Sequence, residues 1–278
     1  MERLKFILPD FTHYCWSSKH SKDIWENRIS RIRIAWRELE IQSVASGLRS
    51  CCLVSVHPLK LIEFTNKYLN SNLTILPLKM VGVSACTYSS TSKKFEPGSE
   101  YEYLMAIGTK SKVEEFKMEW DRGNNKDIGI LLGYPRCCTE FFDKIWVKEK
   151  YLDTTWHMAL NSRNVKHDSN FVELVLKFQT NVLWRWIGVR LVPHLPCSFD
   201  CIPSIDLGND FLELGIRMGY KDEMEWLKEI LSWSVEWSAL HGIGEIKNPL
   251  FKISTRVDAT PTKYVVKVGS NTAIADSG

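Results

Sequence analysis

The chain has 278 residues, of which 44% are hydrophobic and 25% charged, and its formal net charge is +3 at pH 7. This composition excludes wholesale disorder, and no apolar run reaches the roughly 18 residues that a membrane-spanning helix needs. The near balance of charges gives no global electrostatic reason to bind nucleic acid. We therefore expect neither a membrane partner nor a nucleic-acid partner.

The first residues, MERLKFILPDFTHYC, do not have the pattern of a signal peptide, because their apolar stretch is short and an Asp follows it. We therefore expect the protein in the reducing cytoplasm. In that compartment its eight cysteines are expected to be free thiols, metal ligands or catalytic groups and not structural disulfides. The 11 tryptophans indicate that several indole rings are buried.

The N-terminal part mixes helical and strand-like segments. Residues 24–70 have helical spacing, with Ile and Trp recurring between charged residues. Residues 73–107 are β-branched and aromatic on both sides of a polar stretch, which predicts two strands around a long loop. Residues 111–123 again have helical spacing and end at a glycine. The vicinal pair Cys51 and Cys52 precedes an apolar run and is expected in the core.

From residue 127 onward the pattern is mostly helical. The expected helices cover residues 135–150, 170–190, 208–218 and 221–241. The last ten residues are expected to be mobile. A break near residues 123–127 suggests three parts, namely an N-terminal α/β part (1–123), a helical cysteine-rich domain (124–255) and a partly flexible C-terminal tail (256–278). The predicted fold class is α+β and helix-rich, with a small antiparallel sheet in the N-terminal part and a helical, cysteine-containing C-terminal part.

The first informative cysteine segment is GYPRCCTEFF. Its Gly-Tyr-Pro predicts a turn, and Pro135 suits the first position of a helix, where its missing N–H costs nothing. Cys137 and Cys138 then fall in the first helical turn, where free N–H groups and the helix dipole lower the pKa of a thiol. The alternative is that Cys138 is simply a small buried residue of the core.

The second segment is VRLVPHLPCSFDCIPS, in which three prolines favour a rigid loop. Its two cysteines are four residues apart, so one helical turn would place both sulfurs on one face. Zinc would take four of the candidate ligands, and an iron–sulfur cluster would use mostly the cysteines. A pair of half-buried thiols is the alternative. The candidate ligands from both segments are Cys137, Cys138, His194, Cys197 and Cys201.

The order GYPRCC and then PHLPCSFDC resembles a prokaryotic protein family of unknown function, which has a Gly-Tyr-Pro-x-Cys-Cys motif and a later His-x-Pro-Cys-x-x-x-Cys motif. The resemblance covers residues 125–250, about half of the chain, and implies a shared cysteine-rich site without implying a reaction. The second segment is not the CxxxCxxC motif of radical enzymes that use S-adenosylmethionine, because Ser204 stands at the third cysteine position.

Acid–base and anion-binding candidates lie near these segments in sequence. His241 is predicted to end a Trp-rich helix, where it is either a capping residue or, with Glu236 or Glu245, a general acid or base facing the cysteine site. Arg190 is a candidate for binding an anionic substrate, and an ordinary surface ion pair is the alternative.

These observations predict a metalloenzyme that uses an iron–sulfur cluster or a Cys/His-bound metal to transform a small molecule. Iron–sulfur is preferred to zinc at this point, because cysteine outnumbers histidine among the candidates. One alternative is a non-catalytic binding module in which zinc staples two helical segments. Another is a metal-free thiol redox protein. The sequence leaves the substrate, the reaction and the oligomeric state open.

Overall fold

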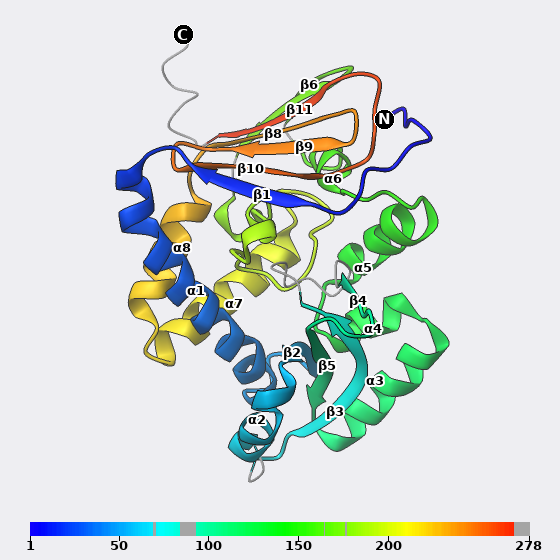
Figure 1. Cartoon of the computed structure of the whole chain (residues 1–278), viewed down its shortest axis with the longest axis vertical. Helices are drawn as coiled ribbons and strands as arrows, with labels where there is room; N and C mark the ends of the chain where they lie inside the picture. Colours follow the sequence, from blue (N-terminus) through cyan, green and yellow to red (C-terminus); the bar gives the residue numbers. More distant parts are fainter. Residues whose placement is uncertain (69–70, 84–92, 164, 176, 270–278) are drawn as a thin grey trace.

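The computed structural model describes residues 1–278 except 69–70, 84–92, 164, 176 and 270–278 (Figure 1). The described residues form two β-sheets and eight α-helices, so the fold is mixed α+β, as the sequence predicts. In the view of Figure 1 the larger sheet lies at the top and the smaller one at the bottom, with helices between and beside them. None of the described helices has the length and apolar character needed to cross a membrane.

The seven-stranded sheet brings the start of the chain beside its last strands. In spatial order it consists of β1 (Thr12–Trp16), β10 (Phe251–Arg256), β9 (Ile243–Lys247), β8 (Val235–Leu240), β11 (Tyr264–Gly269), β7 (Phe171–Val175) and β6 (Lys166–Asp168). Neighbouring strands are antiparallel, except that β11 and β7 are parallel. Thr12 in β1 lies opposite Thr255 in β10, so this sheet joins segments from near the start and near the end of the chain.

The four-stranded sheet is antiparallel and belongs to the N-terminal part. In spatial order it consists of β2 (Cys51–Val56), β5 (Tyr101–Gly108), β3 (Thr74–Gly82) and β4 (Lys93–Lys94). The pairing of β3 with β5 confirms the two strands predicted within residues 73–107. Cys51 and Cys52 are fully buried in β2, which confirms their expected place in the core.

Local chemistry accounts for the ends of two helices. The longest, α1 (Lys19–Ala45), begins after Ser18, whose Oγ accepts a hydrogen bond from the backbone N–H of Ser21 at 3.0 Å. Gly123, with φ of +68°, ends α3 (Lys110–Arg122), as the sequence predicts. The other helices are α2 (Leu61–Tyr68), α4 (Asn125–Leu131), α5 (Arg136–Phe142), α6 (Thr155–Leu160), α7 (Ile202–Arg217) and α8 (Lys221–Leu231).

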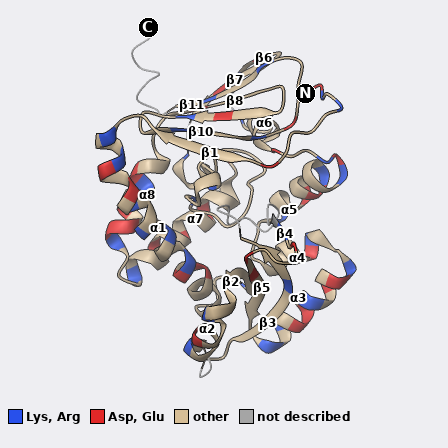
Figure 2. Cartoon of the chain, in the orientation of Figure 1, with Lys and Arg blue, Asp and Glu red and all other residues tan. Residues whose placement is uncertain are grey.

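The largest apolar core lies between α1, α7 and α8 and the seven-stranded sheet. Trp184 and Trp237 are almost completely buried in it, which confirms that several indole rings are internal. Two smaller clusters pack around the four-stranded sheet. Acidic and basic residues are interleaved along α3 and α8 (Figure 2), in keeping with the nearly balanced charge of the chain.

The structure corrects the predicted helices at three places. Residues 51–56 form β2 inside the predicted helix 24–70, residues 171–175 form β7, and α8 ends at Leu231 before β8 begins. The strands β2, β7 and β8 each pair with a neighbouring strand. At these places the strand pairing decides the secondary structure, although the apolar spacing of the sequence suggested helices. The C-terminal part therefore contains the larger sheet and is not helical throughout.

The C-terminal tail also differs in part from the expectation. Residues 264–269 form the inner strand β11, while residues 270–278, on which the predicted mobility falls, lie outside the described part of the chain. The boundary after residue 123 stays a prediction.

Candidate metal centre

Four cysteine sulfurs meet where two helices begin. Cys137 and Cys138 lie in the first turn of α5, as predicted, and Cys201 is the N-cap residue of α7. Cys197 lies in the loop that leads into α7. All four sulfur atoms lie within 4.8 Å of one another. The two segments singled out in the sequence are therefore adjacent, and together they form a group that could hold a metal ion.

The local sequence explains why these cysteines stand at helix starts. Gly133 precedes α5 with φ of +75°, and a Cβ at this position would lie only 2.6 Å from Cγ of Arg49. Both facts require glycine. Pro135 is the N-cap of α5, one residue before its predicted position. Pro203 lies in the first turn of α7, where its missing N–H removes no helical hydrogen bond.

The sulfur atoms are close together but not bonded to each other. The Sγ of Cys201 lies 3.6 Å from that of Cys138 and 3.7 Å from that of Cys137, and the two vicinal sulfurs are 3.8 Å apart. A disulfide bond would bring two sulfurs to about 2.05 Å. Every cysteine in the described part of the chain is a free thiol.

Polar groups around the cluster hold the sulfurs in place. The backbone N–H of Cys197 donates to Sγ of Cys138 at 3.3 Å, and Oγ of Ser204 lies 3.3 Å from Sγ of both Cys138 and Cys201. The loop is anchored because Nδ2 of Asn161 donates to the carbonyl oxygen of Cys197 at 2.9 Å. Such outer contacts orient ligands before a metal binds.

The four thiols have strongly different proton affinities. Hydrogen bonds from Cys138 and Cys197 lower the pKa of Cys201 far below its ordinary value. Hydrogen bonding to Cys197 and Cys201, together with burial, raises the pKa of Cys138. Burial and the neighbouring Cys201 raise the pKa of Cys137. One thiolate is thus stabilised by surrounding thiols, and a cation is the natural agent for ionising the others.

His194 lies beside the cluster and not within it. The four clustered groups are all cysteines, whereas Nε2 of His194 lies 2.8 Å from Oγ of Ser204. The imidazole stacks on the ring of Tyr134, with centroids 5.2 Å apart. Burial lowers the pKa of His194 to about 3, so the ring is neutral at pH 7. Ser204 thus separates this predicted ligand from the sulfurs.

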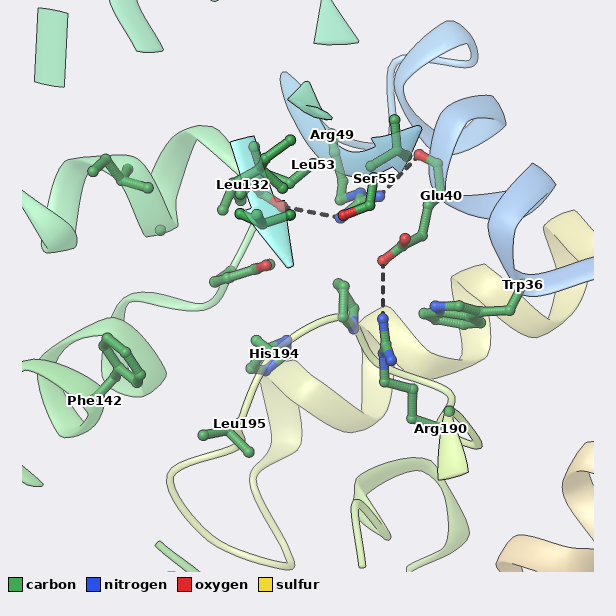
Figure 3. A pocket seen from close by; sticks show the side chains of 18 of the residues that line it. Trp36, Glu40, Arg49, Leu53, Ser55, Leu132, Phe142, Arg190, His194 and Leu195 are labelled. Carbon is green, nitrogen blue, oxygen red and sulfur yellow. Dashed lines mark hydrogen bonds and ion pairs between the residues drawn. The ribbon is translucent and has the colours of Figure 1, made fainter. Parts of the chain in front are cut away.

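A cavity of about 880 Å³ adjoins the cluster (Figure 3). Cys138 and His194 contribute to its wall, and so does Arg190. Arg190 is buried and its Nη2 lies 3.4 Å from Oε1 of Glu40, so it is not a surface ion pair. The role of Arg190 in binding an anionic substrate stays a prediction.

The remaining acid–base candidates lie on the β8–β9 hairpin. His241 occupies its turn with φ of +50° and an exposed side chain, so the predicted helix end is wrong. The prediction failed because residues 235–240 directly before it pair as a strand. Glu236 and Glu245 form ion pairs with lysines of the same sheet. Among the described residues, none of these three lines the cavity or bonds to a cluster cysteine. Their catalytic role stays a prediction.

Sequence reasoning missed three contributors to the site. Ser204 follows Cys201 by three residues, a helical spacing that could have indicated its contact with the sulfur. Glu40 and Trp36 reach the cavity from α1, about a hundred residues before the cysteines, and no local pattern indicates this.

Compared with known proteins, the chain matches no family model, no curated protein and no solved structure. The resemblance in the two cysteine motifs stays a prediction.

Proposed function

We propose that the chain binds one zinc ion through Cys137, Cys138, Cys197 and Cys201. A tetrahedral site with zinc–sulfur bonds of about 2.3 Å requires sulfur atoms roughly 3.8 Å apart. The sulfur pairs among Cys137, Cys138 and Cys201 measure 3.6, 3.7 and 3.8 Å, and the sulfur of Cys197 lies within 4.8 Å of each of them. This agreement between sulfur spacing and a tetrahedral single-ion site is the observation that carries the proposal.

The same spacing favours zinc over the iron–sulfur cluster preferred from the sequence. In a cluster, the cysteine ligands are distributed over several irons with inorganic sulfide between them. Their sulfurs are then separated by the width of the cluster. Four sulfurs that all lie within 4.8 Å of one another instead surround a volume suited to a single ion. Zinc is the usual ion for four thiolates in a structural site.

We further propose that the ion is structural. Four protein ligands leave no open coordination position for water or substrate. The ion joins the start of α5 to the start of α7, and Cys138 and Cys197 are 59 residues apart in the chain. This is the zinc-stapled binding module among the alternatives that the sequence left open. Any chemistry on a small molecule then falls to side chains of the adjoining cavity and not to the metal.

The proposal is tested by metal content. The native protein, purified without chelator, is expected to contain one zinc ion per chain by inductively coupled plasma mass spectrometry. Cys197→Ser and Cys201→Ser are each expected to lose stoichiometric zinc. Cys15→Ser is the matched control, because Cys15 is exposed on β1, outside the cluster. Full zinc occupancy in both cluster variants would contradict the proposal.

A second measurement does not depend on variants that fold. Replacing zinc by Co²⁺ in the native protein is expected to give the intense visible bands of a tetrahedral thiolate site. Iron with an equal amount of acid-labile sulfide would instead indicate a cluster and would overturn the zinc proposal.

A further inference from the structure

The cavity beside the cysteine cluster has the size of a ligand site. Its volume of about 880 Å³ lies within the range of roughly 300–1,000 Å³ found for small-molecule pockets. Its walls come from α1, β2, α4, α5 and the loop before α7 (Figure 3). Segments that are as far apart in the chain as Ser30 and Leu195 thus surround one space.

Two polar atoms in its wall have no partner among the described residues. Nε1 of Trp36 and Nδ1 of His194 are buried and make no hydrogen bond within the described chain. Both side chains are only 3% exposed, and both line the cavity. Figure 3 shows the indole nitrogen of Trp36 at the end of the ring that faces the cavity. Buried polar atoms are normally paired, so these two indicate ligand contacts.

Contacts with neighbours fix the direction of both atoms. Trp36 stacks on Phe211 of α7, with ring centroids 5.0 Å apart, and His194 stacks on Tyr134. A flip of the Trp36 ring would disturb this packing, and a flip of the His194 ring would break the contact of its Nε2 with Oγ of Ser204 at 2.8 Å.

The proposed zinc centre also decides what His194 offers. Thiolates that bind a metal can only accept hydrogen bonds, so Ser204 gives its single proton to Sγ of Cys138 or Cys201. Oγ of Ser204 must then accept from His194, which places the imidazole proton on Nε2. The Nδ1 atom is left as an unpartnered acceptor on a side chain that lines the cavity. A ligand therefore presents a donor to His194 and an acceptor to the N–H of Trp36.

The charge of the wall favours an anion. Five cationic side chains line the cavity, against the two carboxylates of Glu40 and Glu102. The cationic residues are Arg33, Arg37, Arg49, Lys150 and Arg190. The carboxylate of Glu40 is already engaged by Arg190, which leaves the cations in excess.

Arg33 and Arg37 are the best placed to receive the anionic group. They lie one turn apart on α1, where two like charges repel each other. Arg33 forms no ion pair with a described residue, and its side chain lies against Gly188. A Cβ at Gly188 would approach Nε of Arg33 to 3.2 Å, so the glycine lets this arginine lie along the wall. Anion binding would relieve the repulsion between the two arginines.

We propose that this cavity binds a small ring-containing organic anion, with its carboxylate or phosphate group at Arg33 and Arg37. A donor on the ligand meets Nδ1 of His194, and an acceptor meets Nε1 of Trp36. The part of this proposal that concerns His194 rests on the proposed zinc centre, whereas the preference for an anion does not.

The test uses three matched probes and the zinc-loaded protein. Phenyl phosphate, benzoate and benzyl alcohol share an aromatic ring and differ in charge, and each is titrated by calorimetry at low ionic strength. At least one of the two anions is expected to bind one site with an affinity about tenfold or more above that of benzyl alcohol. The better anion identifies the group as phosphate or carboxylate. Equal affinities for all three probes, or no binding of either anion, would overturn the proposal.

Variants then locate the bound anion. The double variant Arg33→Met/Arg37→Met removes two exposed side chains and is expected to weaken anion binding about tenfold while leaving benzyl alcohol unaffected. Arg217→Met is the matched control, because Arg217 is exposed at the end of α7 and does not line the cavity. Trp36→Phe is expected to weaken binding about fivefold. Unchanged anion binding in the double variant would contradict the assigned site.

Zinc content measured on the same samples separates the two proposals. Anion binding by protein that never acquires zinc would contradict the zinc centre and the role given to His194, while supporting the anion site. One zinc ion per chain without anion binding would contradict the anion site alone.

Discussion

At the scale of single residues, Ser204 connects the two halves of the site. Its hydroxyl lies within 3.3 Å of two cluster sulfurs and 2.8 Å from the imidazole of His194. The clustered groups that could hold a metal ion are the four cysteines, and the serine hydroxyl lies beside them. Its place in the structure is that of an outer contact, which orients ligands and shares their negative charge.

Removal of this hydroxyl is expected to weaken the metal site without destroying it. Ser204→Ala keeps all four sulfurs but removes their shared hydrogen bond, so zinc affinity should fall about 10–100-fold. Competition with a calibrated chelator measures this change. Ser232→Ala is the control, since the Ser232 hydroxyl bonds only to the carbonyl of Lys228 within the described chain. Equal zinc affinity in the two variants would show that Ser204 does not support the cluster.

The second prediction at this scale concerns acid stability. Burial lowers the pKa of His157 from 6.5 to about 4, and its ring packs on Tyr151 with centroids 4.1 Å apart. Between pH 6.5 and 4 the unfolded chain therefore binds a proton at this position that the folded chain does not. The free energy of unfolding should be fully retained above pH 6.5 and should decrease as the pH falls through this window.

Urea denaturation between pH 4 and 7 checks this sign. His157→Gln should show a smaller loss of stability across the window than the native chain, because the buried ionisable group is gone. The variant keeps every other titrating group of the native chain, so the difference between the two stability curves is due to His157. Parallel curves for the two proteins would contradict the assignment.

At the scale of secondary-structure elements, a buried carboxylate joins segments that are distant in sequence. Asp153 accepts from Nη2 of Arg185 at 2.9 Å, from Nε1 of Trp237 at 3.1 Å and from the backbone N–H of Thr155 at 2.8 Å. These partners come from a 3₁₀ turn, from β8 and from the start of α6. The network fixes the sheet against the loop that leads to the cysteine cluster.

Loss of the charge in this network is expected to be costly. Asp153→Asn leaves the buried guanidinium of Arg185 without its counter-charge and should reduce the free energy of unfolding by about 3 kcal/mol. Asp121→Asn is the control, because Asp121 pairs with Lys117 on the exposed face of α3 and should cost less than about 0.5 kcal/mol. Denaturant midpoints measure both changes. Similar midpoints for the two variants would contradict the importance of the network.

The elements also show which parts of the fold the sequence could predict. The strands β3 and β5 and the helix α3 were predictable, because turn residues and apolar spacing agree locally. The strand β8 was not, because it follows α8 without a strong break and only its pairing with β9 and β11 makes it a strand. The first turn of α5, with its Pro and vicinal cysteines, was predictable from residues alone.

At the scale of the whole molecule, the candidate site depends on contacts that local patterns do not contain. The cysteines were recognisable by type and spacing, but their mutual distances require α5 and α7 to converge. The cavity wall from α1 was not predictable, because Trp36 and Glu40 are placed by the packing of α1 against α7 and α8. The predicted position of His241 at a helix end was wrong for the same reason, because the strand β8 before it was predicted as a helix.

The zinc centre is expected to stabilise the entire fold. It closes a long loop between α5 and α7, and metal binding to the folded chain alone adds its free energy to folding. Chelation should therefore lower the melting temperature measured by calorimetry, and stoichiometric zinc should restore it. Cys15→Ser should respond to chelation as the native chain does. An unchanged melting temperature after complete zinc removal would contradict the structural role.

The most direct measurement is zinc X-ray absorption spectroscopy of the native protein. The expected result is a single shell of four sulfur atoms at about 2.3 Å from the zinc ion, with no metal–metal scattering. That result would match the sulfur spacing of Cys137, Cys138, Cys197 and Cys201. A nitrogen or oxygen ligand in the first shell, or a neighbouring metal atom, would contradict a zinc centre formed by these four cysteines.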